Sequence, residues 1–190
     1  MDLSKYHQKR DFNSTTEPKG EIKKSKNEFI FVVQEHAASH LHYDFRLEMD
    51  GVLKSWAIPN GPSMNPQEKR LAIMVEDHPY DYKDFEGTIP KGNYGAGSVI
   101  VWDEGTYVLT EEQITVPVSD QFKSDLQKGQ LSFILKGKKL KGEFALVRLK
   151  IPQKNAWLLI KKRDQYAHKA DILKESKSVI SHLTLEEMGT

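Results

Sequence analysis

The sequence contains no cysteine, and this absence limits the chemistry open to the chain. Without thiols there are no disulfides and no thiolate metal sites, so a bound metal would need histidine, carboxylate or backbone oxygen ligands. The sequence also lacks a run of about 18 apolar residues, the length that a membrane-spanning helix requires. Its first residues form no apolar signal segment. We therefore expect a cytoplasmic protein with no membrane partner.

A strong excess of one charge is absent as well. The chain has 28 lysines and arginines against 27 aspartates and glutamates, for a formal net charge of +1. Proteins that coat nucleic acid generally carry a large positive charge. Any contact with nucleic acid is therefore expected from a local patch or from recognition of a strand end. The length of 190 residues suits one domain with a hydrophobic core.

Three regions differ in composition. Residues 1–26 are rich in lysine, glutamate, serine and threonine, which predicts a partly flexible N-terminal arm. Residues 27–165 alternate between apolar and polar positions and are expected to form a β-rich domain. Residues 166–190 are polar and weakly helical, and we interpret them as a C-terminal tail.

Short β-type segments run through the central region. Strands are predicted over residues 29–33, 40–48, 52–58, 70–78, 98–103, 106–109, 131–135, 143–150 and 156–162. Asp50-Gly51 and Glu104-Gly105 are interpreted as hairpin turns. One helix is expected over residues 119–128, with Ser119 as N-cap and Gly129 as its stop. This pattern favours a mainly β fold, either an antiparallel barrel or a sandwich, with one or two short helices.

One strand face carries unusual polar residues. His42 and Asp44 are two residues apart, so on a strand their side chains share a face and their Cα atoms lie roughly 7 Å apart. His36 lies six residues before His42, and the small residues 37–39 between them allow the chain to bend back. Two imidazoles and a carboxylate suit Mn²⁺, Fe²⁺, Zn²⁺ or Co²⁺. Three protein ligands would leave positions for water and substrate.

Other residues extend this face toward phosphate chemistry. Arg46 continues the same strand face, and its planar guanidinium suits phosphate oxygens. In the predicted strand 70–78, Arg70, Glu76 and His78 share one face. If the two faces meet, His78 can donate a proton or stabilise charge on a phosphoryl group. A metal, an arginine and a histidine together are typical of phosphoryl chemistry.

The residue pattern by itself leaves alternatives open. The polar face of a strand is commonly just solvated, although such faces usually carry lysine, glutamate and threonine rather than histidines. His42-x-Asp44 with the distal His78 also resembles the ligand set of a non-haem iron oxygenase, but no arginine follows in residues 88–91 to hold 2-oxoglutarate. A third alternative is a non-catalytic module that binds DNA ends and recruits a ligase. The glycine-rich loop 87–97 lacks a nucleotide-binding spacing and is interpreted as turn geometry.

Two long stretches carry a family resemblance. They read QEHAASHLHYDFRLEMDGVLKSWAIPNGPS and KRLAIMVEDHPYDYKDFEGTIPKGNYGAGSVIVWDEGTY, and YHQKRDFNSTTEPKG in the arm adds to them. Together they resemble the 3′-phosphoesterase domain of bacterial DNA ligase D and its stand-alone relatives, over nearly the whole chain. The resemblance implies a compact antiparallel β-barrel and a repair enzyme that uses Mn²⁺, with Co²⁺ or Zn²⁺ as alternatives.

The resemblance also implies an activity and partners. Such enzymes act on nucleic acid 3′ ends, often on primer–template DNA with a terminal ribonucleotide. A phosphodiesterase step removes the terminal nucleoside, and a phosphomonoesterase step then leaves a 3′-hydroxyl for a DNA ligase or polymerase. We expect a monomer.

The residue roles that the resemblance implies fall into three groups. The metal ligands are His36, His42 and Asp44. The catalytic positions are the phosphate-binding Arg46, the phosphate-contacting His78, the supporting Tyr82, and Gln34, Arg70 and Glu76. The arm residues Arg10, Asp11 and Glu17 complete the site, which implies that the arm folds over the substrate. Asn60 departs from the lysine that the family usually has in this turn, and we expect weaker substrate binding or an altered balance between the two steps.

Overall fold

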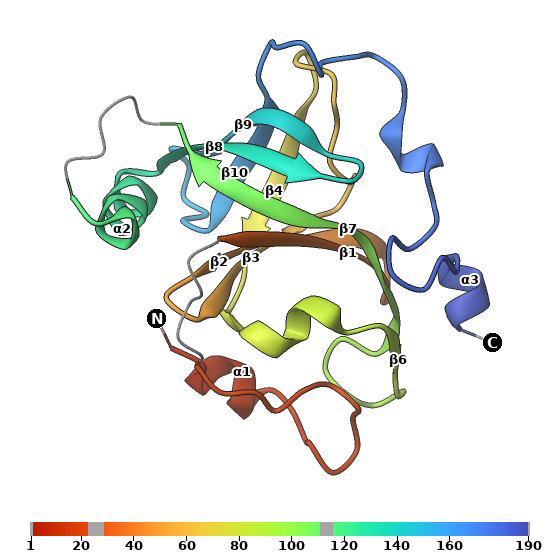
Figure 1. The fold of residues 1–190 in the computed structure, drawn as a ribbon. Coiled ribbons are helices and arrows are strands. Elements are labelled where there is room, and N and C mark those ends of the chain that lie inside the picture. Colours follow the sequence, from red (N-terminus) through yellow and green to blue (C-terminus); the bar gives the residue numbers. More distant parts are fainter. Residues whose placement is uncertain (1, 23–28, 111–115, 190) are drawn as a thin grey trace.

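The fold is built mainly from antiparallel strands. The computed structural model describes residues 2–22, 29–110 and 116–189. The main strands are β1 (Ile30–Ala37), β2 (Leu41–Met49), β3 (Val52–Ile58), β4 (Lys69–Met74), β7 (Gly97–Leu109), β8 (Gln130–Gly137), β9 (Lys141–Arg148) and β10 (Ala156–Lys161). Within these described ranges they pair in the order β1-β2-β3-β4-β10-β9-β8-β7, and β7 pairs back with β1 (Figure 1). The predicted β-barrel is confirmed.

Shorter elements lie outside this ring. They are α1 (Ser4–Gln8), β5 (His78–Pro79), the 3₁₀ helix η1 (Tyr80–Asp84), β6 (Gly87–Ile89), α2 (Val118–Lys128), η2 (Ile172–Lys174) and α3 (Leu185–Met188). β5 pairs with β3, and β6 pairs with β7. Figure 1 shows α1 and the arm, drawn in red, below β1, β2 and β3, on the side away from β8, β9 and β10. The arm, η1 and β6 therefore form a second layer over one wall of the barrel.

Apolar side chains form two cores, one on each side of this wall. Inside the barrel, Phe45 and Trp56 belong to the larger cluster of buried residues. On the outside of the wall, Val32 and Leu53 pack with Tyr6 from the arm in a second cluster. Strand β2 is consequently buried on both faces over Tyr43–Met49. The polar face predicted for this strand lies under a second layer rather than in water.

The predicted strand over residues 70–78 is wrong in its second half. β4 ends at Met74, and residues 75–77 follow an irregular path before His78 pairs with Leu53 of β3. This path is fixed by a bond from Val75 N–H to the Ser55 carbonyl at 3.0 Å. His78 therefore reaches the outer face of the wall by its own short strand and does not share a strand face with Arg70.

The predicted hairpin around Glu104-Gly105 is also wrong. β7 runs without a break from Gly97 to Leu109 and pairs with β1 on one side and β8 on the other. A Cβ atom at Gly105 would lie 2.2 Å from the Lys136 carbonyl oxygen, so the glycine permits a close approach of two strands instead of a turn. The Asp50-Gly51 turn between β2 and β3 is present as predicted.

The predicted helix is confirmed with a shifted start. α2 begins at Val118 after an N-cap at Pro117, where no side chain caps the helix, and its C-cap is Gly129. Ser119 therefore lies inside the first turn. The Pro117 carbonyl closes the first turn instead, because it accepts from Asp120 N–H at 2.9 Å and from Gln121 N–H at 3.1 Å.

The described part of the arm packs closely on the barrel. Tyr6 is fully buried, and its hydroxyl donates a hydrogen bond to the Pro18 carbonyl at 2.6 Å. The polar composition of the arm predicted flexibility, because composition does not show that a few residues such as Tyr6 bind to distant parts of the chain. The predicted boundary between arm and barrel at residues 26 and 27 lies outside the described residues. In the tail, Val179 N–H bonds to the Val101 carbonyl at 2.9 Å, so this segment lies against β7.

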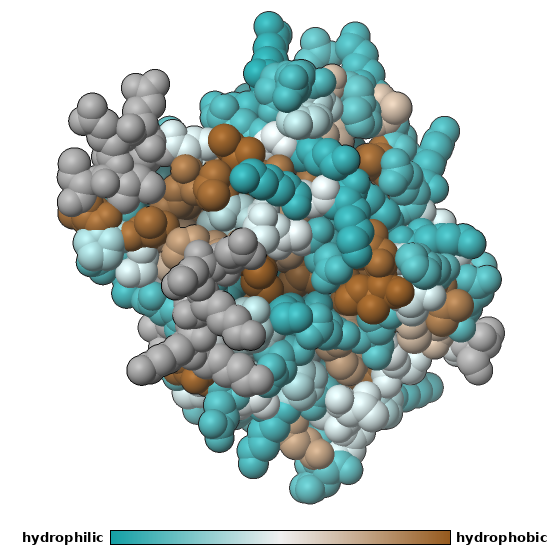
Figure 2. Space-filling view, viewed as in Figure 1, coloured by the Kyte–Doolittle hydropathy of each residue, from teal (hydrophilic) through white to brown (hydrophobic). Residues whose placement is uncertain are grey.

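The visible surface is mainly hydrophilic. In Figure 2 hydrophobic residues occur as separate patches among hydrophilic ones. Across the described residues, none of the helices combines the length and the apolar composition needed to cross a membrane.

Candidate active site

Three potential metal ligands converge at the paired ends of β1 and β2. In the antiparallel register His36 lies opposite His42, and Gln34 lies opposite Asp44. Cross-strand neighbours in such a pair are close enough for their side chains to touch. One ligand atom from each of His36, His42 and Asp44 lies within 4.8 Å of the others. Strand pairing therefore brings His36 and His42 together although they are six residues apart in the sequence.

Backbone hydrogen bonds orient both imidazoles. His36 Nε2 lies 2.8 Å from the Gly95 carbonyl oxygen, and His42 Nδ1 lies 3.0 Å from the His40 carbonyl oxygen. A carbonyl only accepts, so each of these nitrogens carries the proton. His36 Nδ1 and His42 Nε2 are left with lone pairs, and each lies 3.7 Å from an Asp44 carboxylate oxygen. Outer hydrogen bonds that fix the tautomer in this way are typical of metal-binding histidines.

Arg46 joins the carboxylate to a buried polar network. Its guanidinium donates to Asp44 Oδ2 at 3.0 Å, to Gln34 Oε1 at 2.9 Å and to Ser55 Oγ at 2.8 Å. Gln34 is itself held, because its amide donates to the Tyr82 and Phe85 carbonyls at 2.9 Å each. A guanidinium has five N–H donors. These three bonds thus leave two donors of Arg46 for a ligand.

The charge of Arg46 controls the ionisation of Asp44. Burial alone would raise the pKa of this carboxyl, but the positive charge of Arg46 holds the pKa well below its ordinary value. An opposite charge at short distance favours the ionised form. Asp44 is therefore a carboxylate at neutral pH, the form that binds metal.

His78 is buried beside this network as a neutral imidazole. Its Nδ1 lies 3.0 Å from the Glu76 carbonyl oxygen, and its Nε2 lies 3.2 Å from an Arg10 amino nitrogen. Arginine only donates, so Nδ1 carries the proton and Nε2 accepts. Burial, and then the charges of Arg46 and Arg10, lower the pKa of His78 well below its ordinary value.

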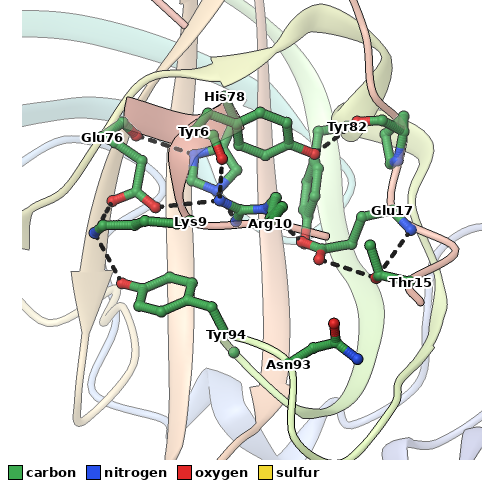
Figure 3. A network of polar contacts seen from close by, with 12 residues as sticks. Tyr6, Lys9, Arg10, Thr15, Glu17, Glu76, His78, Tyr82, Asn93 and Tyr94 are labelled. Atoms are coloured by element: carbon green, nitrogen blue, oxygen red, sulfur yellow. Dashed lines mark hydrogen bonds and ion pairs between the residues drawn. The ribbon is translucent and has the colours of Figure 1, made fainter. Parts of the chain in front are cut away.

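The arm closes this side of the site with ion pairs (Figure 3). Arg10 Nε donates to Glu17 Oε1 at 2.9 Å, and both side chains are at least 95% buried, with exposures of 5% and 1%. The same Glu17 oxygen accepts the Tyr82 hydroxyl at 2.8 Å. On the other flank Lys9 pairs with Glu76 at 2.9 Å. The arm thus contributes charged groups to a site whose other residues come from the barrel wall and from the segments that pack on it.

These groups surround one cavity of about 250 Å³. Its lining includes the three potential ligands, both arginines and His78, together with Tyr94 and Gly95 from the glycine-rich loop. Two imidazoles, a carboxylate and several cations suit a small anion held beside a divalent metal. A volume of this size admits a phosphate group and part of the molecule attached to it.

A family model of the DNA ligase D 3′-phosphoesterase domain matches residues 34–148, which is more than half of the chain. The chain belongs to the DNA ligase D 3′-phosphoesterase domain family. The multifunctional non-homologous end joining protein LigD of Pseudomonas aeruginosa is 50% identical over 96% of the chain and 22% of its own length. The protein of the same name from Mycolicibacterium smegmatis is 44% identical over 86% of the chain and 21% of its own length. The chain therefore spans about a fifth of these relatives.

Most of the site residues expected of a DNA ligase D phosphoesterase domain come together in the structure. Ten of the thirteen lie in the cavity or touch its lining: Arg10, Glu17, Gln34, His36, His42, Asp44, Arg46, Glu76, His78 and Tyr82. The other three lie elsewhere. The Asp11 side chain accepts the Asn13 N–H, Arg70 pairs with Glu68 at 2.6 Å, and Asn60 is exposed in the turn after β3.

Sequence reasoning missed four residues that belong to or touch this candidate site. Ser55 accepts from Arg46 and lies 3.3 Å from His78 Nδ1. Lys9, Tyr94 and Gly95 join the arm and the glycine-rich loop to the ligands. The position of Ser55 opposite Arg46 in a predicted hairpin was a usable signal for the first of them. No local pattern identified the other three, because their partners are distant in sequence.

Proposed function

We propose that this chain is a metal-dependent 3′-end-processing phosphoesterase. In this proposal a phosphodiesterase step removes a 3′-terminal ribonucleoside, and a phosphomonoesterase step converts the remaining 3′-phosphate into a 3′-hydroxyl. The observation that carries the proposal is one cavity shared by the His36, His42 and Asp44 donors, Arg46 and His78. Membership of the DNA ligase D 3′-phosphoesterase domain family supports it.

The donor set fits a divalent metal. His36 Nδ1, His42 Nε2 and an Asp44 oxygen would hold the ion, and both imidazoles are already oriented with these nitrogens free. Two imidazoles and a carboxylate suit Mn²⁺, which we propose as the ion, with Co²⁺ or Zn²⁺ as alternatives. When bound, such an ion polarises a phosphate oxygen as a Lewis acid.

The protein groups have separate tasks in this proposal. Arg46 offers its two remaining donors to phosphate oxygens, and Gln34 and Ser55 keep its planar group from rotating. His78 is neutral in the free chain, but a phosphate dianion beside it favours its protonated form. We propose that His78 then stabilises the charge that develops on the transferring phosphoryl group. Tyr82 holds Arg46 and His78 in position, because its ring contacts both side chains and its hydroxyl is bonded to Glu17.

The relatives' names suggest the biological setting. They are non-homologous end joining proteins, and we propose that this chain prepares strand ends for a DNA ligase or polymerase in the same process. Family membership disfavours the iron oxygenase, although its ligand type is also two histidines and a carboxylate. Oxygen-dependent turnover of 2-oxoglutarate would revive that alternative.

A labelled substrate tests the proposal. A 5′-labelled primer–template that ends in one ribonucleotide is incubated with and without Mn²⁺, and the product ladder separates the two hydrolytic steps. We expect His42→Ala to abolish both products while the circular dichroism spectrum stays native. His40→Ala is the matched control, because His40 is exposed and only its backbone carbonyl contacts the site. Full activity of His42→Ala with added Mn²⁺ would contradict the metal assignment, and end binding without any product would favour the non-catalytic module.

A further inference from the structure

Tyr94 is an exposed aromatic residue at the candidate active site. Its exposed fraction is 49%, and it lies on the loop between β6 and β7. Of the large hydrophobic side chains exposed in the described ranges, Tyr94 is the one that lines the cavity of His36, His42 and Asp44. An aromatic ring left half in water beside a cavity of charged groups is a surface available to a ligand.

The position of the Tyr94 ring is fixed relative to the metal ligands. The next residue, Gly95, accepts the hydrogen bond from His36 through its carbonyl. The preceding residue, Asn93, accepts from the Ser14 hydroxyl at 2.6 Å and donates to the Ser14 carbonyl at 3.3 Å. Figure 3 shows Asn93 and Tyr94 on one side of the network formed by the arm. The loop is thus tied both to a ligand and to the arm, so little ordering remains when a ligand binds.

Cations lie against the same ring. The Lys9 ammonium is 4.5 Å from the ring centroid and donates to the Tyr94 hydroxyl at 3.2 Å, and the Arg10 guanidinium is 5.6 Å from the centroid. Single-stranded nucleic acids are bound by this combination, with aromatic rings for the bases and cations for the backbone. Free inorganic phosphate would use the cations but not the ring.

We propose that Tyr94 stacks on the base of the 3′-terminal nucleotide and thereby positions the adjoining phosphate at the His36, His42 and Asp44 donors. This inference rests on the proposed function, because it assigns the substrate of that site. Stacking tolerates any base, so the site recognises a nucleotide end without reading its sequence. The competing explanation is that Tyr94 only anchors Lys9, and through it the arm, by its hydroxyl.

Direct binding, measured without added metal so that no turnover occurs, tests the stacking role. Fluorescence anisotropy measures the Kd of a labelled single strand that carries a 3′-phosphate, with either adenine or a base-free sugar at the last position. For the adenine strand we expect Tyr94→Leu to raise the Kd about tenfold and Tyr94→Phe, which keeps the ring, to raise it less than about threefold. For the base-free strand the wild type and Tyr94→Leu should bind within about twofold of each other. If Tyr94→Phe raised the Kd for the adenine strand as much as Tyr94→Leu does, the hydroxyl and not the ring would be responsible. That result would support the anchoring explanation and overturn stacking.

Steady-state kinetics on the same strands separates positioning from general damage. We expect Tyr94→Leu to raise KM with a smaller change in kcat, because the ring binds a base and not the reacting atoms. Tyr166→Leu is the matched control, since Tyr166 is 44% exposed and lies outside the cavity lining. A wild-type chain that binds strands tenfold better than Tyr94→Leu but never hydrolyses them would refute the proposed function and leave this inference standing. Unchanged binding by Tyr94→Leu in a hydrolytically active enzyme would refute this inference alone.

Discussion

Replacing Glu17 by glutamine should loosen the arm over the active site. The Glu17 carboxylate accepts from Arg10 and Tyr82 through one oxygen and from Thr15 at 3.1 Å through the other. Glutamine has nearly the same shape but no charge, so the substitution removes electrostatic support and leaves the packing in place. The docked arm loses stability relative to a state in which it has left the barrel.

The magnitude follows from these bonds. A hydrogen bond to a charged group contributes about 1.5–3 kcal/mol and a neutral one about 0.5–1.5 kcal/mol, so the Tyr82 bond, which becomes neutral, loses about 1 kcal/mol. Arg10 keeps a hydrogen bond to the new amide, but its buried charge loses its nearest carboxylate, which costs at least about 1 kcal/mol more. The Thr15 hydroxyl can accept from the new amide, so that bond is kept. Arg10 also keeps Glu76 at 3.4 Å as a second partner. The total of about 2 kcal/mol corresponds to roughly a thirtyfold rise in the detached population.

Limited trypsin digestion measures this population. Arg10 is buried in the docked arm, so cleavage after it requires detachment, and its rate follows the detached fraction when reclosing is faster than cleavage. Mass spectrometry of the products should show cleavage about thirtyfold faster in Glu17→Gln. Glu21→Gln makes the same chemical change at an exposed arm position and should leave the rate unchanged. A rise of less than about threefold in Glu17→Gln would refute the reasoning that this ion pair holds the arm.

Three further substitutions have defined outcomes. Because the pKa of His78 is lowered, the unfolded chain gains a proton below about pH 6.5 that the folded chain does not. Between about pH 7.5 and about pH 5.5 the free energy of unfolding should therefore fall by roughly 1 kcal/mol more in the wild type than in His78→Asn, and an equal fall in urea titrations of both proteins would contradict this. Burial raises the pKa of Glu35 above its ordinary value, so its charge costs stability at neutral pH. Glu35→Gln should therefore raise the free energy of unfolding, and by more near pH 7 than near pH 5. Asn60→Lys should tighten strand binding and steepen its salt dependence by about one counterion, and an unchanged slope would place this turn away from the bound strand.

The sequence alone determined the features that depend on neighbouring residues, namely which side chains share a strand face and where most strands and turns lie. The alternation in β2 fixed that His42, Asp44 and Arg46 share one face, because side chains on a strand alternate sides regardless of its partners. Turn residues and apolar patterning located most strands and α2 within a few residues. The type of metal donor also followed from residue identity, since the chain has no thiolate to offer. The family resemblance depended on longer stretches of sequence, and it suggested roles for residues such as Tyr82 and Glu17 that the spacing of residues did not indicate.

Strand pairing and layering were decided only in the tertiary structure. Glu104-Gly105 has the composition of a turn, yet β7 passes through it because β8 comes too close for a side chain at Gly105. His78 reaches the site through a separate two-residue strand, a path that depends on β3 and not on its own neighbours.

The arm shows the same limit most clearly. Its residues 2–22 contain few apolar side chains, and the groups that hold Arg10 and Glu17 in place include Glu76, His78 and Tyr82, which are 65 to 68 residues away in the chain. Charged side chains in a sequence are by default solvated, and only a cavity that already carries opposite charges repays their burial. The potential metal ligands could therefore be predicted from local spacing, whereas the charged cavity around them exists because distant segments pack together.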